Sequence, residues 1–504
     1  MPTLLNSHAR LEAEDNNGQT ALHCAAQYGH WKVLRILLAN NANRNAEDDE
    51  QRTPAYYAAN HNQGRVSTKH EICDWVFRNG HDEGARDDHG DTLLLFAAYR
   101  GMPPLVTDLL DRGSELEATR GAGITPLIAA AARGNESTTR LLLDRDARIE
   151  ARDPNSSTAL IRAAWRGHTE VVRTLLDRGA DFRATNSEEM TSLYVAARCN
   201  HSETVRLLLE SGANATGQQL FWASECGRVE IIVPLIKAGA DLEYRATNGD
   251  TPLIIAAYCD NSAAVKILIH SGANIEIRRH DNATALWIAA EQGHEQVVQV
   301  LLDYGADIES KGQPLAYTSL GKAAQQGHLA IVRLLLDRGA NVESSNDYGH
   351  TALMEAAQNN RVRIADLLIS KGANIESRDL SQKGSTPLIL AATNNHREVS
   401  ELLLERGANL EARNSASQAS PLAEACKRNS SAVVPLLLQS GADVDTRQRL
   451  GQTPLMQAAI RGNKDMVELL LRYGAYRGAK DNTGLTAMAH AAGKGHDEIV
   501  QLLG

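Results

Sequence analysis

The stretch from Thr284 to Glu309 reads TALWIAAEQGHEQVVQVLLDYGADIE, and this pattern decides the fold of the chain. The same order of residue types returns as TALIRAAWRGHTEVVRTLLDRGADFR from Thr158 to Arg183, and as TALMEAAQNNRVRIADLLISKGANIE from Thr351 to Glu376. Each stretch has a threonine start, an Ala-Ala pair, a polar break, two pairs of large aliphatic residues and a Gly-Ala stop. We therefore interpret the chain as a series of copies of one structural unit.

The copies follow one another at a nearly constant spacing. Most openings lie 33 residues apart, at Thr20, Thr53, Thr92, Thr125, Thr158, Thr191, Thr251, Thr284, Thr318, Thr351, Thr386, Ser420, Thr453 and Thr486. One further copy, from Leu220 to Ala240, lacks its opening residue, so the count is about fifteen. This period and pattern resemble the ankyrin repeat, whose signature is Thr-Pro-Leu-His-x-Ala. The resemblance implies an all-α solenoid in a curved superhelical rod, with two antiparallel helices and a projecting β-turn finger in each copy.

The residues themselves also predict paired helices. Thr125 places a capping hydroxyl before Pro126, which is a typical helix start because proline at the first position loses no hydrogen bond. Gly293 is expected to end the first helix of its copy, and Gly305 the second, where a left-handed residue is needed. The aliphatic pairs fall on one face of the second helix. A single unit is too short to bury that face alone, so stacking of neighbours must stabilise it.

Composition and charge exclude several classes of protein. The formal net charge of −10 argues against a general affinity for nucleic acid, which needs a basic surface. The chain has no run of about 18 apolar residues, so we expect no membrane insertion. The first residues contain no apolar core of signal-peptide length. We expect an intracellular location, with the cytoplasm ahead of the nucleus.

Departures from the repeat divide the chain into four segments. We interpret them as the tail of a truncated preceding repeat (1–15), an N-terminal array (16–214), a repeat without its finger that serves as a hinge (215–246), and a C-terminal array that ends mid-repeat (247–504). Both ends look cut rather than capped, and our hypothesis is that the chain is one arm of a longer polypeptide or an array whose ends do without polar caps.

Smaller irregularities also need an explanation. The second copy carries about six extra residues near 62–67, between its two helices. Pro234 and Pro435 lie early in their second helices. They are tolerated there only if their nitrogens fall within the unpaired first turn.

The chain contains no motif that indicates catalysis, a cofactor or a metal. His294-Glu295 begins like the zinc-protease helix His-Glu-x-x-His, but the fifth residue is Val298. Neither a phosphate-binding Gly-x-x-x-x-Gly-Lys-Ser/Thr loop nor a Gly-x-Ser-x-Gly elbow occurs. We therefore expect a protein that is not an enzyme and that binds no cofactor.

Histidine and cysteine recur at fixed places in the copies. The histidines at the break between helices are interpreted as structural residues that hydrogen-bond that loop, at His30, His168, His201, His294, His328, His396 and His496. Cys199, Cys226 and Cys259 share one position in three adjacent copies. Packed helices lie about 8–10 Å apart, whereas the Cα atoms of a disulfide lie about 4.4–6.8 Å apart. We therefore expect these cysteines to pack as small residues rather than to form a disulfide or bind a metal.

One group of variable residues predicts a binding site. The resemblance implies that partners bind the turn tips and the concave side of the first helices, where the two residues after Ala-Ala are most exposed. At these positions several copies carry aromatic or arginine residues, namely Tyr99, Arg100, Arg133, Trp165, Arg166, Arg198 and Tyr258. These residue types dominate binding hot spots. Our hypothesis is a groove for an acidic or extended protein segment, and the alternative is an ordinary exposed, variable surface.

The leading functional interpretation is a non-enzymatic scaffold that binds a protein or peptide. The alternative is a sensor or recognition arm of a larger multidomain protein, such as a nucleotide-dependent switch protein. Phrases such as GANIESRD at 372–379 are typical of long fungal-like arrays. The identity of the partner and the oligomeric state are left open by the sequence.

Overall fold

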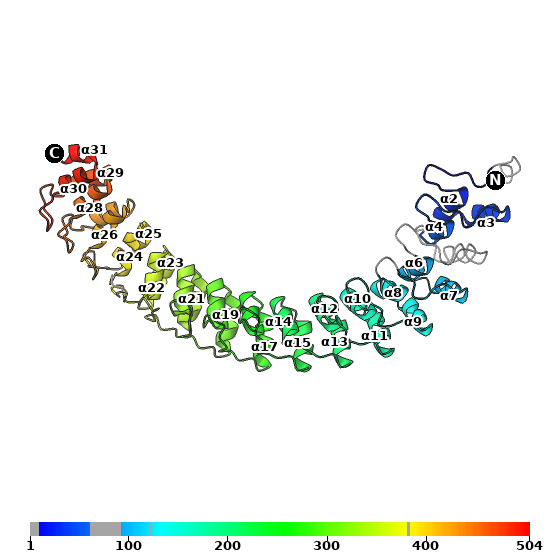
Figure 1. The fold of residues 1–504 in the computed structure, drawn as a ribbon. Helices are drawn as coiled ribbons and strands as arrows, with labels where there is room; N and C mark the ends of the chain where they lie inside the picture. The colour runs from blue at the N-terminus through cyan, green and yellow to red at the C-terminus, as the bar shows by residue number, and fades with distance from the viewer. Residues whose placement is uncertain (1–9, 61–91, 120–122, 381–383) are drawn as a thin grey trace. The chain divides into compact units, whose positions relative to one another are not determined.

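The computed structural model of the chain describes residues 10–60, 92–119, 123–380 and 384–504. In these residues the chain forms 29 helices and one pair of two-residue strands. Most of the helices follow one another in consecutive pairs (Figure 1). Contacts divide the chain into two compact units: unit 1 comprises residues 1–223 and 230–240, and unit 2 comprises residues 224–229 and 241–504. The predicted all-α repeat fold is confirmed, while the extra residues near 62–67 lie outside the described part.

Each helix pair consists of an even-numbered first helix and the odd-numbered second helix that follows it. In unit 1 the first helices are α2 (Ala21–Gln27), α4 (Pro54–Asn60), α6 (Leu93–Arg100), α8 (Pro126–Ala132), α10 (Ala159–Arg166) and α12 (Ser192–Arg198). The described second helices are α3 (Trp31–Ala39), α7 (Pro103–Asp111), α9 (Glu136–Asp144), α11 (Thr169–Asp177) and α13 (Ser202–Glu210). The pair α14 (Gly217–Glu225) and α15 (Val229–Lys237) contains the division between the units.

Unit 2 repeats the same arrangement. Its first helices are α16 (Pro252–Tyr258), α18 (Ala285–Gln292), α20 (Ser319–Gln326), α22 (Ala352–Gln358), α24 (Pro387–Thr393), α26 (Pro421–Arg428), α28 (Pro454–Arg461) and α30 (Ala487–Lys494). Its second helices are α17 (Ser262–His270), α19 (Glu295–Asp303), α21 (Leu329–Asp337), α23 (Val362–Ser370), α25 (Arg397–Glu405), α27 (Val434–Gln439), α29 (Lys464–Arg472) and α31 (Asp497–Leu503). The strands β1 (Lys311–Gly312) and β2 (Tyr317–Thr318) pair antiparallel in one finger.

The copy opened by Thr158 shows how the sequence sets the helix ends. The Thr158 hydroxyl accepts a hydrogen bond from the N–H of Ile161 at 3.3 Å, which caps the start of α10. Helix α10 ends at Gly167, with φ +72°, and α11 is followed by Gly179, with φ +84°. Thr125 caps α8 in the same way, with Pro126 directly after it, so the predicted start is confirmed.

The core of the array lies between neighbouring copies. Ala163 and Ala164 of α10 are fully buried, and α10 packs against α8 and α12 as well as against its own second helix. Val172 and Leu175 of α11 are likewise buried. Because alanine has almost no side chain, adjacent first helices approach closely, and stability accumulates from one junction to the next.

A glutamate in most turns forms a second link between neighbours. Its carboxylate accepts a hydrogen bond from the backbone N–H two residues after the stop position of the following copy, at 2.6–2.9 Å. That position is glycine except at Asn41 and Asp146, which share its positive φ. The pairs are Glu12–Asn43, Glu117–Arg148, Glu150–Asp181, Glu243–Asn274, Glu276–Asp307, Glu309–Asn341, Glu343–Asn374, Glu376–Asn409 and Glu411–Asp443. In the copy that contains α11, Arg183 takes the place of this glutamate. The backbone N–H at the matching position of the following copy is that of Asn214. That junction therefore lacks a carboxylate at this position.

The copy around α14 differs from its neighbours. Residues 213–216 lead directly into the helix without a finger. Contrary to expectation, this copy does have an opening residue, because the Thr216 hydroxyl accepts from the Gln219 N–H at 3.5 Å and the Gln219 side chain accepts from the Thr216 N–H at 2.8 Å.

The two prolines in second helices behave differently. Pro435 lies in the first turn of α27, as predicted. Pro234 is inside α15, whose first residue is Val229, so the first-turn prediction is wrong for it. Since proline has no N–H, α15 lacks one internal hydrogen bond.

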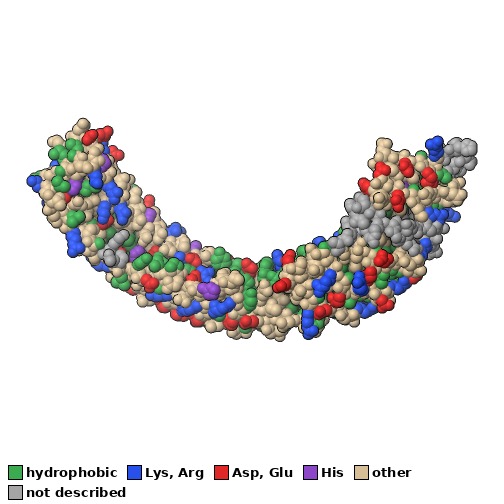
Figure 2. All heavy atoms as spheres, viewed as in Figure 1, with side chains coloured by type: hydrophobic (Ala, Val, Ile, Leu, Met, Phe, Trp, Pro, Cys, Tyr) green, Lys and Arg blue, Asp and Glu red, His purple; other side chains and the backbone are tan. Residues whose placement is uncertain are grey.

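The outer surface carries both signs of charge. Figure 2 shows lysine and arginine side chains interspersed with aspartate and glutamate on the visible face of each unit. Among the described helices, none has the length and apolar character needed to cross a bilayer.

Candidate functional site

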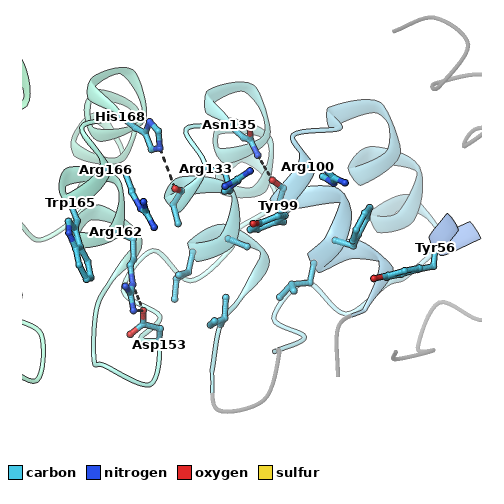
Figure 3. Close-up of a pocket in the computed structure, with 16 residues that line it drawn as sticks. Tyr56, Tyr99, Arg100, Arg133, Asn135, Asp153, Arg162, Trp165, Arg166 and His168 are labelled. Atoms are coloured by element: carbon cyan, nitrogen blue, oxygen red, sulfur yellow. Dashed lines mark hydrogen bonds and ion pairs between the residues drawn. The ribbon is translucent and has the colours of Figure 1, made fainter. Parts of the chain in front are cut away.

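Unit 1 contains a hollow of about 890 Å³ over the first helices α4, α6, α8 and α10 (Figure 3). Five of the seven predicted site residues line this hollow: Tyr99, Arg100, Arg133, Trp165 and Arg166. The structure therefore brings together residues that the sequence places in three different copies.

The hollow exists because α8 contributes small side chains where its neighbours contribute large ones. Ala129 takes the position that Phe96 holds in α6 and Arg162 in α10. Ala132 similarly lies between Tyr99 and Trp165 in the same register. These alanines form a low floor between two taller walls. An alignment of the copies shows the two alanines at these positions, but the sequence-based prediction considered only the large exposed residues.

Arginine side chains hold the aromatic walls in place. The Arg133 guanidinium carbon lies 4.6 Å from the ring centroid of Tyr99, which belongs to the preceding copy. Arg162 lies 5.3 Å from the Trp165 ring in its own helix. Tyr99 and Trp165 remain 41% and 46% exposed, so large aromatic surfaces face solvent. Such cation–π contacts are worth about 0.5–1 kcal/mol each at exposed sites.

A buried ion pair closes one side of the hollow. Asp153, in the finger before α10, is almost fully buried and pairs with Arg162 (Figure 3). The same carboxylate accepts hydrogen bonds from the N–H groups of Asn155 and Ser157, both at 2.9 Å. Asp153 is the only acidic residue among the described residues that line the hollow, and its charge is already compensated. The sequence analysis missed this pair because Asp153 resembles the other turn aspartates.

Two polar side chains that line the hollow, Asn135 and His168, link the copies that contain α6, α8 and α10 through hydrogen bonds. The Asn135 amide donates to the carbonyl oxygens of Ala98 and Tyr99, at 2.9 and 3.0 Å. His168 Nε2 donates to the carbonyl oxygen of Ala132 at 3.3 Å (Figure 3). Burial lowers the pKa of His168 below its ordinary value of 6.5, against the opposing effect of this hydrogen bond. The neutral imidazole is therefore favoured here.

Six of the seven histidines predicted to be structural, all except His30, hydrogen-bond a backbone carbonyl, but their target differs from the prediction. The same bond to the preceding copy joins His201 to Trp165, His294 to Tyr258, His328 to Glu291, His396 to Gln358 and His496 to Ile460, at 2.9–3.3 Å. Each ring thus reaches a carbonyl of the previous copy rather than its own loop. The side-chain donor of one copy thereby meets carbonyls that are unpaired at the end of the first helix of the preceding copy.

The two remaining predicted residues lie outside the hollow. The Arg198 guanidinium carbon lies 5.2 Å from the ring centroid of Trp222, and its Nη1 lies 3.7 Å from the sulfur of Met190. Tyr258 is 48% exposed but belongs to unit 2. The predicted site therefore separates into a five-residue cluster and two residues that the hollow does not include.

No described cysteine lines the hollow. The described cysteines are free, with Cys426 buried and Cys199 and Cys259 partly buried. Cys226 is exposed, so the expectation that it packs as a small residue is wrong. Within the described residues, no group of three or more His, Cys, Asp or Glu side chains is placed to hold a metal ion.

Comparison with known proteins agrees with the repeat geometry. A family model described as ankyrin repeats (3 copies) matches nine overlapping segments, from residues 1–87 to residues 422–504. The ankyrin repeat domain-containing protein SAT10 of Stachybotrys chartarum is 28% identical over 134 residues, which are 22% of this chain and 7% of that protein. Inversin of Canis lupus familiaris is 30% identical over 113 residues, 22% of this chain and 10% of inversin.

A third relative covers a similarly small part. The ankyrin repeat and SOCS box protein 3 of Homo sapiens is 29% identical over 124 residues, 19% of this chain and 24% of that protein. The chain thus spans a quarter or less of each of these relatives. Because the family model covers it from end to end and the helix pairs follow the same period, the chain belongs to the ankyrin repeat family.

Proposed function

We propose that this protein is a non-enzymatic interaction scaffold whose unit 1 binds an acidic, extended segment of a partner protein in the hollow over α8. Ankyrin repeats generally act as protein–protein interaction modules. The observation that carries the proposal is a hollow with exposed aromatic walls and arginines around an alanine floor.

The charge of the hollow favours an acidic partner. Among the described residues that line it are four arginines and one acid, Asp153, which is paired with Arg162. In the described part of the chain, Arg133 and Arg166 have no ion pair with aspartate or glutamate. The arginines of the hollow attract carboxylates. The chain as a whole has a net charge of −10, so its remaining surface repels other acidic surfaces.

The apolar surface of the hollow favours one large side chain among the carboxylates. Ile128 and Ala129 are buried in the floor, and the rings of Tyr99 and Trp165 stand on either side. Aromatic and arginine residues in a partly enclosed site are the usual anchors of protein interfaces. Cation–π contacts keep these rings ordered before binding, which lowers the entropic cost of association.

Selection from a random peptide library on the immobilised full chain tests this proposal. We expect enriched peptides to carry several aspartates or glutamates and at least one large apolar residue. The double variant Trp165→Ala, Arg166→Ala should weaken their binding about tenfold or more, with the circular dichroism spectrum unchanged.

Two matched variants serve as controls. Arg173→Ala removes an arginine that is 52% exposed on α11 of the same copy, and Tyr348→Ala removes an aromatic ring that is 49% exposed in unit 2. Neither should change the affinity. Peptides without acidic residues, or an unchanged affinity of the Trp165 and Arg166 variant, would contradict the proposed site.

A further inference from the structure

We propose that the bound segment is a polyproline II helix with a carboxylate at every third residue, laid across α8 and α10. This inference rests on the proposed function and specifies the pattern that unit 1 recognises. It follows from the spacing of the arginines rather than from their charge alone.

The arginines of the hollow recur once in each copy. Arg100, Arg133 and Arg166 each follow the opening threonine of their copy by eight residues, so they lie 33 residues apart. Their copies are in direct contact, since His168 of one donates to the carbonyl of Ala132 in the other at 3.3 Å. Helices packed in this way have axes about 8–10 Å apart. The helix positions that carry these arginines therefore recur at steps of that size.

A polyproline II helix has the same step. It has three residues per turn and rises about 3.1 Å per residue, so every third side chain faces the same way after about 9.3 Å. A β-strand instead returns to the same face after about 6.6 Å, which does not match one copy. An α-helix needs seven residues to advance about 10.5 Å and is itself about 10–12 Å wide.

The walls of the hollow also suit this conformation. Segments in the polyproline II conformation dock onto grooves lined with aromatic rings, because the peptide is already ordered and its flat faces pack against the rings. Tyr99 and Trp165 present such rings two copies apart, with the alanine floor between them. A segment that crosses from one ring to the other passes Arg133 and Arg166 in turn (Figure 3).

Two labelled peptides of identical composition separate register from charge. One contains four Glu-Pro-Pro triplets, and the other contains the same residues with the glutamates in adjacent pairs. We expect the full chain to bind the triplet peptide about tenfold more tightly in fluorescence anisotropy, since the paired pattern forfeits a charge-assisted contact. Arg166→Ala should remove this difference, and Arg173→Ala should preserve it.

A gain-of-function variant extends the same register. Cys199 follows Thr191 by eight residues, and its backbone (φ −88°, ψ 4°) resembles that of Arg133 (φ −103°, ψ −2°). Cys199→Arg therefore places a fourth arginine one copy beyond Arg166, at a position with a similar backbone conformation. The triplet peptide should bind this variant about threefold more tightly or better, whereas the paired peptide should gain less.

The outcomes distinguish the two levels of the proposal. Equal affinity for both peptides, weakened by the Trp165 and Arg166 double variant, would overturn the period of three while supporting an acidic site. Tighter binding of a helical peptide with glutamates every seventh residue would overturn the polyproline II conformation. If none of these three acidic peptides binds, both the register and the proposed function are wrong.

Discussion

Single residues connect one copy to the next. His168 donates to the carbonyl of Ala132, and Asn135 makes the corresponding bonds to Ala98 and Tyr99 one copy earlier. Histidine and asparagine both serve at this position because each can donate a side-chain N–H to a backbone carbonyl of the preceding copy. The glycine that ends the first helix of the preceding copy lies against this side chain, so it must leave room for the histidine ring.

Gly167 provides a test of that requirement. It has φ +72°, and a β-carbon added there would overlap Nδ1 of His201. Gly179, with φ +84°, has open space around the same position. We expect Gly179→Ala to cost about 1 kcal/mol for the left-handed backbone alone, and Gly167→Ala to cost at least about 1 kcal/mol more. Urea unfolding would measure both, and equal losses would contradict a role for the His201 contact.

His168 should also make stability depend on pH. Its folded-state pKa lies below the ordinary 6.5 because of burial, so as pH falls through 6.5 the unfolded chain takes up the proton first. Stability is therefore full above that value and is lost as the solution is acidified. His168→Asn should retain the bond, as Asn135 does, and reduce the loss between pH 7.5 and about 5.5. Parallel denaturation curves at each pH would check this, and an identical pH dependence in both proteins would contradict it.

At the scale of the helix pair, a carboxylate hydrogen bond reinforces the packing of neighbours. Glu150 accepts from the Asp181 N–H at 2.8 Å, and Glu276 accepts from the Asp307 N–H at 2.7 Å. Arg183 interrupts this series, although its guanidinium lies 5.2 Å from the ring of Phe182. The pair α12 and α13 is consequently joined to its predecessor by apolar packing, by the His201 bond to Trp165, and by polar contacts such as Thr169 with Thr204 at 2.9 Å.

Arg183→Glu should restore the interrupted bond. We expect the new carboxylate to accept from the N–H of Asn214 and to stabilise unit 1 by about 0.5–1.5 kcal/mol. Arg183→Ala is the matched control, since it removes the same contact with Phe182 without adding an acceptor. Chemical denaturation of the full chain would show the difference, and equal midpoints for the two variants would argue against the bond.

At the scale of the whole molecule, stability is distributed along the array and is not uniform. The pair α14 and α15 lacks a finger, contains Pro234, and follows the junction at Arg183. The division between the two compact units falls in the same pair. A hinge at residues 215–246 stays a prediction, and local opening of this pair is its simplest consequence.

Hydrogen exchange would detect that opening. We expect backbone amides of α14 and α15 to exchange about tenfold faster than those of α18 and α19, which have a complete finger and flanking carboxylate bonds. The two pairs belong to the same chain, so solvent conditions are matched. Equal protection in both pairs would contradict a weak segment.

The sequence alone determined the repeat, the helix ends and the register of the exposed residues. Each of these depends on interactions within one copy: Thr158 caps its own helix, Gly167 ends it, and Val172 and Leu175 share one face because of the helical period. Tyr99, Arg133, Trp165 and Arg166 could be chosen because their exposure follows from the same local pattern.

Only the tertiary structure decided what these residues do to one another. The stacking of Arg133 on Tyr99, the reach of His168 to Ala132, and the hollow over Ala129 each join residues of different copies. Arg162 and Asp153 lie nine residues apart, but their pairing depends on how the finger folds back over α10. Such contacts arise from side chains that meet only after the copies have stacked, which a pattern within one copy does not encode.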